Sequence, residues 1–189
     1  MTVLFVNACL RGEESRTLKL CREYLDGIED VREVNLVELK LEPYYGESAA
    51  FRAQLEAKDL FDDPMFDIGK DFAEADEIVI GAPYWDLSFP AALKVYIEHA
   101  AVMGVTFHYT DQGVCEGLCR ARHLTYITTG GGNVTGANYG YDYLRGIAGM
   151  FGIPETRFAC AENLDVVGAN VEANLDAARA VLAELKATR

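Results

Sequence analysis

Hydrophobic residues fall along the chain in short runs of the kind that form buried strands. Residues 2–8 and 77–82 are apolar and rich in β-branched side chains, which is typical of strands covered on both faces. Residues 124–129 and 155–161 predict two further strands, and residues 31–39, which alternate imperfectly, predict another. The pattern therefore predicts five main strands separated by longer segments.

The segments between these strands have the spacing of helices. Ser15 can cap a helix that runs to Leu25, and Pro90 lies in a favoured first-turn position before another. Helices are expected at residues 49–60, 68–75, 91–103, 139–151 and 171–186. Strands that alternate with helices predict an α/β fold whose parallel sheet has helices on both faces. No linker or repeat interrupts residues 1–189, so a single domain is expected.

The charge balance narrows the classes of partner. The formal net charge is −13 and the isoelectric point is about 4.6, which argues against nucleic acid and anionic membranes as partners. An anionic cofactor would need local positive potential, such as a helix N-terminus. The five cysteines lack the spacing of a metal site, so no metal is expected and free thiols in a reducing cytoplasm are the simplest interpretation.

The loop after the first strand combines features that suit a phosphate. Ser15 and Thr17 offer hydroxyls at the start of a helix, where the first N–H groups lack partners, and Arg11 and Arg16 add positive charge. An ordinary capped helix would explain the same residues. The glycine fingerprints of dinucleotide sites and of P-loops are absent.

Two more loops follow strands at the same expected edge of the sheet. Residues 83–90 carry two aromatics, Tyr84 and Trp85, in a segment stiffened by prolines, and they suit either a planar ligand or an interface. Thr129 precedes a run of three glycines, which lets a ligand approach the backbone closely or simply makes the loop flexible. Ligands of open α/β sheets bind at this edge, so the three loops together predict a site for a flat ring with a phosphate tail.

At these residues the chain resembles the FMN-dependent NAD(P)H:quinone oxidoreductase and azoreductase family. The resemblance is strongest in APYWDLSFPAALKVYIEHAAVMGVTFHYTDQGVCEGL, residues 82–118, and in YITTGGG, residues 126–132. It implies a flavodoxin-like three-layer sandwich with a five-stranded parallel sheet in the order 2-1-3-4-5. It also implies FMN as the cofactor and NAD(P)H as the electron donor.

The resemblance assigns contacts by position. The phosphate would be held by residues of the first loop, namely Cys9, Ser15, Arg16 and Thr17. The ring would lie between the aromatic loop and the glycine loop, namely Pro83, Tyr84, Trp85, Asp86, Leu87, Thr129, Gly130, Gly131 and Gly132. The family's enzymes are homodimers in which substrate stacks on the flavin between subunits, and the candidates for that wall are Phe107, Tyr109 and Tyr139.

Three residues depart from the family pattern. Cys9 replaces a usual serine, which removes a hydroxyl contact but leaves the backbone donors. Asp86 replaces an asparagine, and a carboxylate beside the reduced flavin would lower its reduction potential if it pointed inward. Ala148 stands where animal quinone reductases have a histidine, so a proton relay through histidine is not expected.

Three functions remain open from the sequence. The first is a two-electron oxidoreductase that passes hydride from NAD(P)H to quinones, azo or nitro compounds by a ping-pong mechanism, with chemistry centred on the flavin and no catalytic side chain. The second is a flavodoxin-like electron carrier, which strong acidity would suit. The third is a binding protein that has lost the cofactor. The physiological acceptor, the choice between NADH and NADPH and the role of residues 40–66 stay undetermined.

Overall fold

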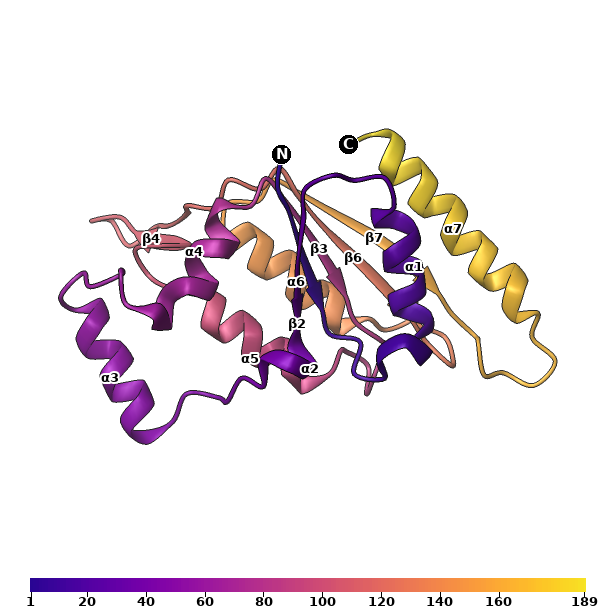
Figure 1. The fold of residues 1–189 in the computed structure, drawn as a ribbon, viewed down its shortest axis with the longest axis horizontal. Coiled ribbons are helices and arrows are strands. Elements are labelled where there is room, and N and C mark those ends of the chain that lie inside the picture. The colour runs from indigo at the N-terminus through magenta and orange to yellow at the C-terminus, as the bar shows by residue number, and fades with distance from the viewer.

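A five-stranded parallel sheet forms the centre of the computed structural model, which describes residues 1–189 (Figure 1). Its order is β2-β1-β3-β6-β7, which confirms the expected order 2-1-3-4-5 when the strands of this sheet alone are counted. The strands are β1 (Val3–Asn7), β2 (Val31–Asn35), β3 (Glu77–Gly81), β6 (His123–Thr129) and β7 (Glu155–Ala161). A separate antiparallel hairpin consists of β4 (Phe107–Tyr109) and β5 (Cys115–Gly117).

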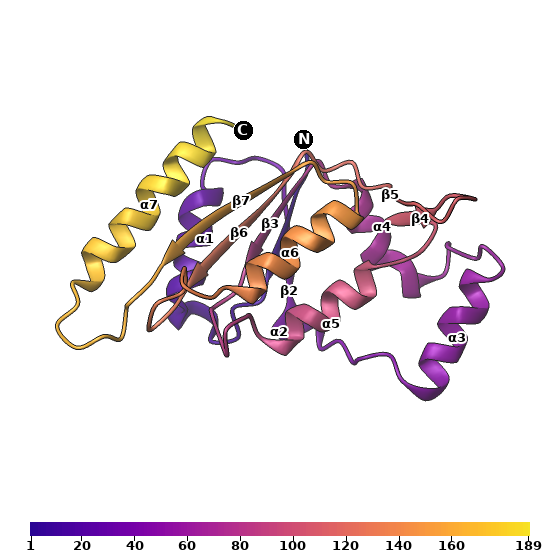
Figure 2. The ribbon, with the colours of Figure 1, turned by 180° about the vertical axis from the view of Figure 1, so that it is seen from behind.

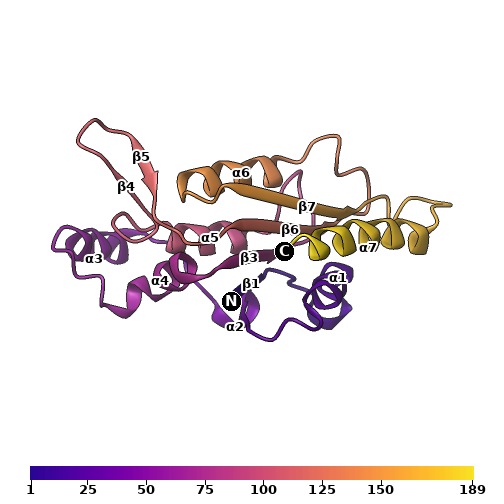
Figure 3. The ribbon, with the colours of Figure 1, turned by 90° about the horizontal axis from the view of Figure 1, so that it is seen from above.

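Helices cover both faces of the sheet (Figures 1, 2 and 3). One face packs against α1 (Arg16–Leu25) and α7 (Val171–Ala187), and the other against α4 (Asp67–Glu74), α5 (Ala91–Ala100) and α6 (Tyr139–Met150). Successive strand residues point to opposite faces, so Phe5 packs toward α1 while its neighbours Leu4 and Val6 join the core under α5 and α6. The sheet therefore lies between two hydrophobic cores.

The register of the sheet brings three loops to one edge. Asn7 at the end of β1 pairs with Gly81 at the end of β3, and Gly81 pairs with Ile127 near the end of β6. All these strands are parallel, so the segments that follow them leave the sheet at the same level. The predicted convergence of these loops at the carboxyl edge is therefore a consequence of strand pairing.

Several element boundaries differ from the sequence-based expectation. The strand expected at residues 31–39 ends at Asn35, whose side chain accepts a hydrogen bond from the Val37 N–H at 3.0 Å and starts the short helix α2 (Leu36–Leu39). The helix expected at residues 49–60 is α3 (Gly46–Glu56). The helix expected at residues 91–103 ends at Ala100, whose carbonyl accepts the Thr106 hydroxyl at 2.9 Å. Side-chain hydrogen bonds to the backbone thus accompany the ends of β2 and α5, which both stop before the residue that the hydrophobic pattern predicts.

The remaining helices agree with the pattern. Short 3-10 turns at Gly12–Glu14 and Pro64–Phe66 precede α1 and α4. The predicted cap at Ser15 is confirmed, because its Oγ accepts the Leu18 N–H at 3.2 Å. None of the helices is both long enough and apolar enough to cross a bilayer.

Gly81 at the end of β3 tests the packing between the sheet and α1. A Cβ at this position would lie 2.5 Å from the Cys21 Sγ and 3.2 Å from the Phe5 ring, and both side chains are fully buried. We expect Gly81→Ala to lower the free energy of unfolding by about 1–3 kcal/mol in urea titrations, because overpacked cores must shift.

Gly146→Ala is the matched control for that substitution. Gly146 is an exposed position of α6 where a Cβ would meet nothing within 4 Å. Removing a helical glycine there should raise stability by about 0.5–1 kcal/mol. Equal stability of the two alanine variants would contradict the packing described for Gly81.

Candidate functional site

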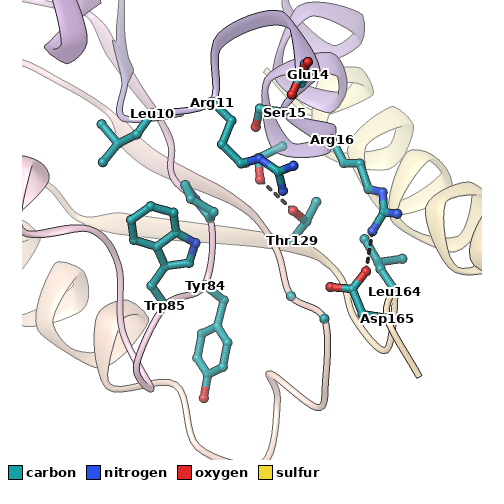
Figure 4. A pocket seen from close by; sticks show the side chains of 14 residues that line it. Leu10, Arg11, Glu14, Ser15, Arg16, Tyr84, Trp85, Thr129, Leu164 and Asp165 are labelled. Atoms are coloured by element: carbon teal, nitrogen blue, oxygen red, sulfur yellow. Dashed lines mark hydrogen bonds and ion pairs between the residues drawn. The ribbon is translucent and has the colours of Figure 1, made fainter. Parts of the chain in front are cut away.

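A cavity of about 440 Å³ lies at the carboxyl edge of the sheet, where the loops after β1, β3, β6 and β7 meet (Figure 4). Its size falls within the range of small-molecule sites, roughly 300–1,000 Å³. Its lining consists of Leu10, Arg11, Glu14, Ser15, Arg16, Thr17, Pro83, Tyr84, Trp85, Thr129, Gly130, Gly131, Leu164 and Asp165.

The β1–α1 loop supplies hydrogen-bond donors to one end of the cavity. Arg16 and Thr17 occupy the first turn of α1, where backbone N–H groups have no carbonyl partner within the helix. The N–H groups of Leu10 and Arg11 make no hydrogen bond inside the chain. Ser15 is buried beneath this turn and orients it by capping. This end of the cavity therefore has the donors and the helix-dipole potential that favour an anion.

The two arginines that line the cavity differ in whether a carboxylate pairs with them. Arg16 Nη1 lies 3.0 Å from Asp165 Oδ1, an exposed ion pair that joins the start of α1 to the β7–α7 loop. Figure 4 shows the Arg11 side chain extending into the cavity, and no carboxylate lies within ion-pair distance of its guanidinium. Glu14 also lines the cavity. Arg11 is thus the cation of this site that has no anionic partner in the chain.

The β3–α5 loop supplies the aromatic wall. The Tyr84 N–H donates to the Thr129 carbonyl at 2.9 Å and its hydroxyl donates to the Ala137 carbonyl at 2.6 Å, so the ring is fixed at both ends. Trp85 follows, and 42% of its surface is exposed, which leaves apolar ring surface free to stack on a planar ligand. The wall is therefore rigid at Tyr84 and open at Trp85.

A tight turn then carries the chain away from the cavity. Trp85 and Ser88 exchange backbone hydrogen bonds of 3.0 and 2.8 Å, and the two residues between them have left-handed backbones, with φ of 50° at Asp86 and 65° at Leu87. This is the geometry of a two-residue hairpin turn, which usually takes asparagine and glycine. Asp86 and Leu87 are consequently absent from the lining.

The glycine loop after β6 forms the opposite wall. A Cβ at Gly130 would lie 2.3 Å from the buried Val134 side chain, so close packing requires glycine there, whereas one at Gly131 would lie 2.5 Å from Oδ2 of the exposed Asp165 and would displace that carboxylate. The carbonyls of Gly130, Gly131 and Gly132 accept N–H groups of the β7–α7 loop. No hydrogen bond inside the chain uses the N–H group of Gly131, which lines the cavity and can therefore donate to a ligand there.

One side-chain hydrogen bond joins the start of α1 to the glycine loop. The hydroxyls of Thr17 and Thr129 lie 2.7 Å apart and are both buried, linking the start of α1 to the end of β6. The phosphate-favouring turn and the glycine loop are therefore held at a fixed separation.

Most residues predicted to contact a cofactor line this cavity. They are Ser15, Arg16, Thr17, Pro83, Tyr84, Trp85, Thr129, Gly130 and Gly131. Cys9, Asp86, Leu87 and Gly132 lie outside the lining. The Cys9 thiol is turned into the core, with Sγ 3.5 Å from the Gly81 carbonyl, and burial raises its pKa to about 11. It is therefore a neutral packing group.

The residues predicted to form a substrate wall lie apart from the cavity. Phe107 and Tyr109 belong to the β4–β5 hairpin, where their rings contact each other and the Phe107 ring stacks on Phe151. Tyr139 begins α6 and donates its N–H to the Leu87 carbonyl at 3.1 Å. None of the three lines the cavity of its own chain.

Four lining residues were missed from the sequence. Leu10 and Glu14 lie in the first loop, beside residues that were singled out. Leu164 and Asp165 follow β7, in a loop for which the sequence predicts no role. The available signal was their position after a parallel strand at the carboxyl edge.

Comparison with known proteins agrees with this geometry. Residues 1–185 match the family described as "Flavodoxin-like fold". An FMN-dependent NADH:quinone oxidoreductase of Clostridium perfringens is 34% identical over 186 residues, 92% of each chain. One of Clostridium beijerinckii is 35% identical over 188 residues, 93% of each chain.

Solved structures show the same likeness. The azoreductase of Bacillus anthracis str. Sterne superposes with a TM-score of 0.83 and 25% identity over 100% of both chains. An FMN-dependent NADH-azoreductase of Bacillus anthracis str. Ames Ancestor, solved in complex with FMN, has the same fold, with a TM-score of 0.84 and 21% identity over 100% of this chain and 99% of that one. The chain therefore belongs to the flavodoxin-like fold family and, within it, to the FMN-dependent NADH:quinone oxidoreductases and azoreductases.

Proposed function

We propose that the protein is an FMN-dependent oxidoreductase that transfers two electrons from NADH to quinones, with azo and nitro compounds as further acceptors. The observation that carries this proposal is the cavity at the carboxyl edge, which has an anion-favouring helix start at one end and a planar aromatic wall beside a free glycine amide at the other. A phosphate tail and a flat heterocycle fit these two environments. The names of the relatives support the same reading.

The phosphate end would be formed by Ser15, Arg16 and Thr17. Their backbone donors require no charged side chain, which suits an anion in a chain of net charge −13. Arg11 would add a guanidinium that has no competing carboxylate. Cys9 would not contact the phosphate, because its thiol is in the core and its N–H donates to Asn7 Oδ1 at 3.0 Å.

The ring would lie between Tyr84 and Trp85 on one side and Thr129, Gly130 and Gly131 on the other. The amide of Gly131 is free to donate to the polar edge of such a ring. Asp86 lies in the turn beyond the wall, so its carboxylate would not face the ring. In this placement Asp86 would have no role in lowering the reduction potential of the flavin.

When bound, FMN supplies the reversible two-electron chemistry, and the chain orients and encloses it. Donor and acceptor would use the same open face in turn, a ping-pong sequence. Tyr84 is not free to act as an acid, because its hydroxyl already donates to Ala137. The protein's contribution is positioning by fixed backbone donors.

A homodimer completes the proposed site. Tyr109 is 56% exposed on the β4–β5 hairpin, which extends away from the sheet and its helices (Figure 3). The exposed apolar residues Val114 and Leu118 lie on or beside the same hairpin. Phe107 and Tyr109 would thus reach the cavity of a second copy, with Tyr139 at its rim. A cytoplasmic location is proposed from the five free thiols.

The phosphate end is tested by Arg11→Ala, which removes the guanidinium that lines the cavity without an ion-pair partner. Loss of a charge-assisted hydrogen bond, about 1.5–3 kcal/mol, should raise the Kd for FMN about tenfold or more in fluorescence titrations. Riboflavin, which has no phosphate, should bind both proteins equally. Arg145→Ala is the control, because Arg145 is an exposed arginine of α6 with only a 3.6 Å pair to Asp142. Equal weakening of FMN and riboflavin would contradict the assignment.

The activity is tested by stopped-flow and steady-state oxidation of NADH. The FMN-loaded protein should oxidise NADH continuously when benzoquinone is present, with parallel lines in double-reciprocal plots, because donor and acceptor exclude each other. An electron carrier would bind FMN without oxidising NADH at a comparable rate. Intersecting lines would contradict the ping-pong sequence.

The shared site is tested by light scattering and by Tyr109→Ala. The mass in solution should be twice 20.8 kDa. The variant should keep FMN affinity but show a raised KM for the quinone, since aromatic stacking contributes about 0.5–1.5 kcal/mol. A mass of one chain would refute the dimer.

A further inference from the structure

Glu162 lies immediately after β7, outside the cavity, and its carboxylate is turned toward the loop that continues from the three glycines. One oxygen, Oε2, accepts the Val134 N–H at 2.7 Å and the Thr135 N–H at 2.9 Å. The Thr135 hydroxyl lies 3.1 Å from Oε2 and 3.3 Å from Oε1. A single side chain therefore satisfies two consecutive backbone donors of this loop.

The surrounding bonds hold both partners in place. The Glu162 carbonyl accepts the Asn174 side chain at 3.0 Å, which ties it to α7. The loop itself turns back at Asn133, whose side chain accepts the Gly136 N–H at 2.7 Å. Val134 is fully buried, and its side chain occupies the space that a Cβ at Gly130 would need. Fixing the Val134 backbone thus fixes the surface against which Gly130 rests.

The ionised carboxylate suits this role. Burial raises the pKa of the Glu162 carboxyl, but hydrogen bonds from Thr135 and Val134 outweigh that effect, so its pKa lies below the usual value. Glycine-rich backbone loses more freedom on ordering than any other, so the loop needs external bonds to keep one shape. Glu162 supplies those bonds from a neighbouring element.

We propose that Glu162 is a positioning residue, whose carboxylate holds the Gly130–Thr135 segment in the one shape that presents the Gly131 amide to the cofactor ring. This role rests on the proposed binding of FMN in the cavity. Glu162 itself contacts no cofactor, since it does not line the cavity. Its effect passes through Val134 to Gly130, the residue that precedes Gly131 in the chain.

The test compares three variants of the full chain. Glu162→Ala removes both backbone bonds and should raise the Kd for FMN about tenfold, because two N–H groups of the loop then lose the acceptor that holds them. Glu162→Gln retains a carbonyl oxygen that can accept both N–H groups, and should stay within about threefold of the native Kd. Glu184→Ala removes an exposed glutamate of α7 that forms no ion pair, and should change nothing.

Hydrogen exchange of the cofactor-free protein gives an independent readout. The amides of residues 130–136 should exchange at least about tenfold faster in Glu162→Ala than in Glu162→Gln, with exchange in β6 and β7 unchanged. If the alanine variant fails to fold, Glu162→Asp retracts the carboxylate by one methylene and should weaken FMN binding in the same direction.

Two results would overturn the proposal. One is native FMN affinity with native exchange at residues 130–136 in the alanine or aspartate variant. The other is a glutamine variant as impaired as alanine, which would assign the effect to charge. A native protein that fails to bind FMN would instead refute the proposed function, and the exchange experiment would still decide whether Glu162 orders the loop.

Discussion

Unpaired backbone N–H groups at the carboxyl edge of a parallel sheet are the feature on which the site depends. The register sets Asn7, Gly81 and Ile127 at one level, so the first turn of α1 and the glycine loop face a common space. Backbone donors and a helix N-terminus attract an anion without any excess of basic residues. An acidic chain can therefore hold a phosphorylated ligand at this edge while the rest of its surface remains negative.

Rigidity is the second property of the site. The Thr17 and Thr129 hydroxyls join two of the loops, and the Tyr84 hydroxyl anchors the aromatic loop to the segment before α6. The turn at Asp86 and Leu87 keeps two L-residues in the left-handed region, which costs on the order of 1–2 kcal/mol each and persists only where the surroundings impose it. Donors fixed in advance lower the ordering cost of binding a flat ring.

Much of the fold could be predicted because strands buried on both faces are continuous apolar runs, as at residues 77–82. The strand order followed from the family resemblance. The strand at residues 31–39 was overextended because Asn35 caps a helix, a local bond that hydrophobic alternation does not encode. A short extended piece is expected from the sequence at residues 106–109, which β4 confirms, but its partner β5 was missed because three residues are too few for a pattern.

The site was predictable to the extent that residue type marks function. Hydroxyls at a helix start and glycines after a strand are such marks, and Ser15, Thr17 and Gly131 line the cavity. Leu164 and Asp165 carry no such mark and enter only through three-dimensional proximity. Asp86 and Leu87 lie outside the lining because the chain reverses in a two-residue turn between Trp85 and Ser88.

Amide chemical shifts of the nitrogen-15-labelled protein, followed as FMN is added to the cofactor-free form, identify the backbone N–H groups that bind the cofactor. Backbone donors report a new acceptor at each N–H individually. This assignment predicts that the largest changes occur at Arg16, Thr17 and Gly131, on opposite walls of the one cavity. Changes confined to another surface, or to only one of these two walls, would contradict it.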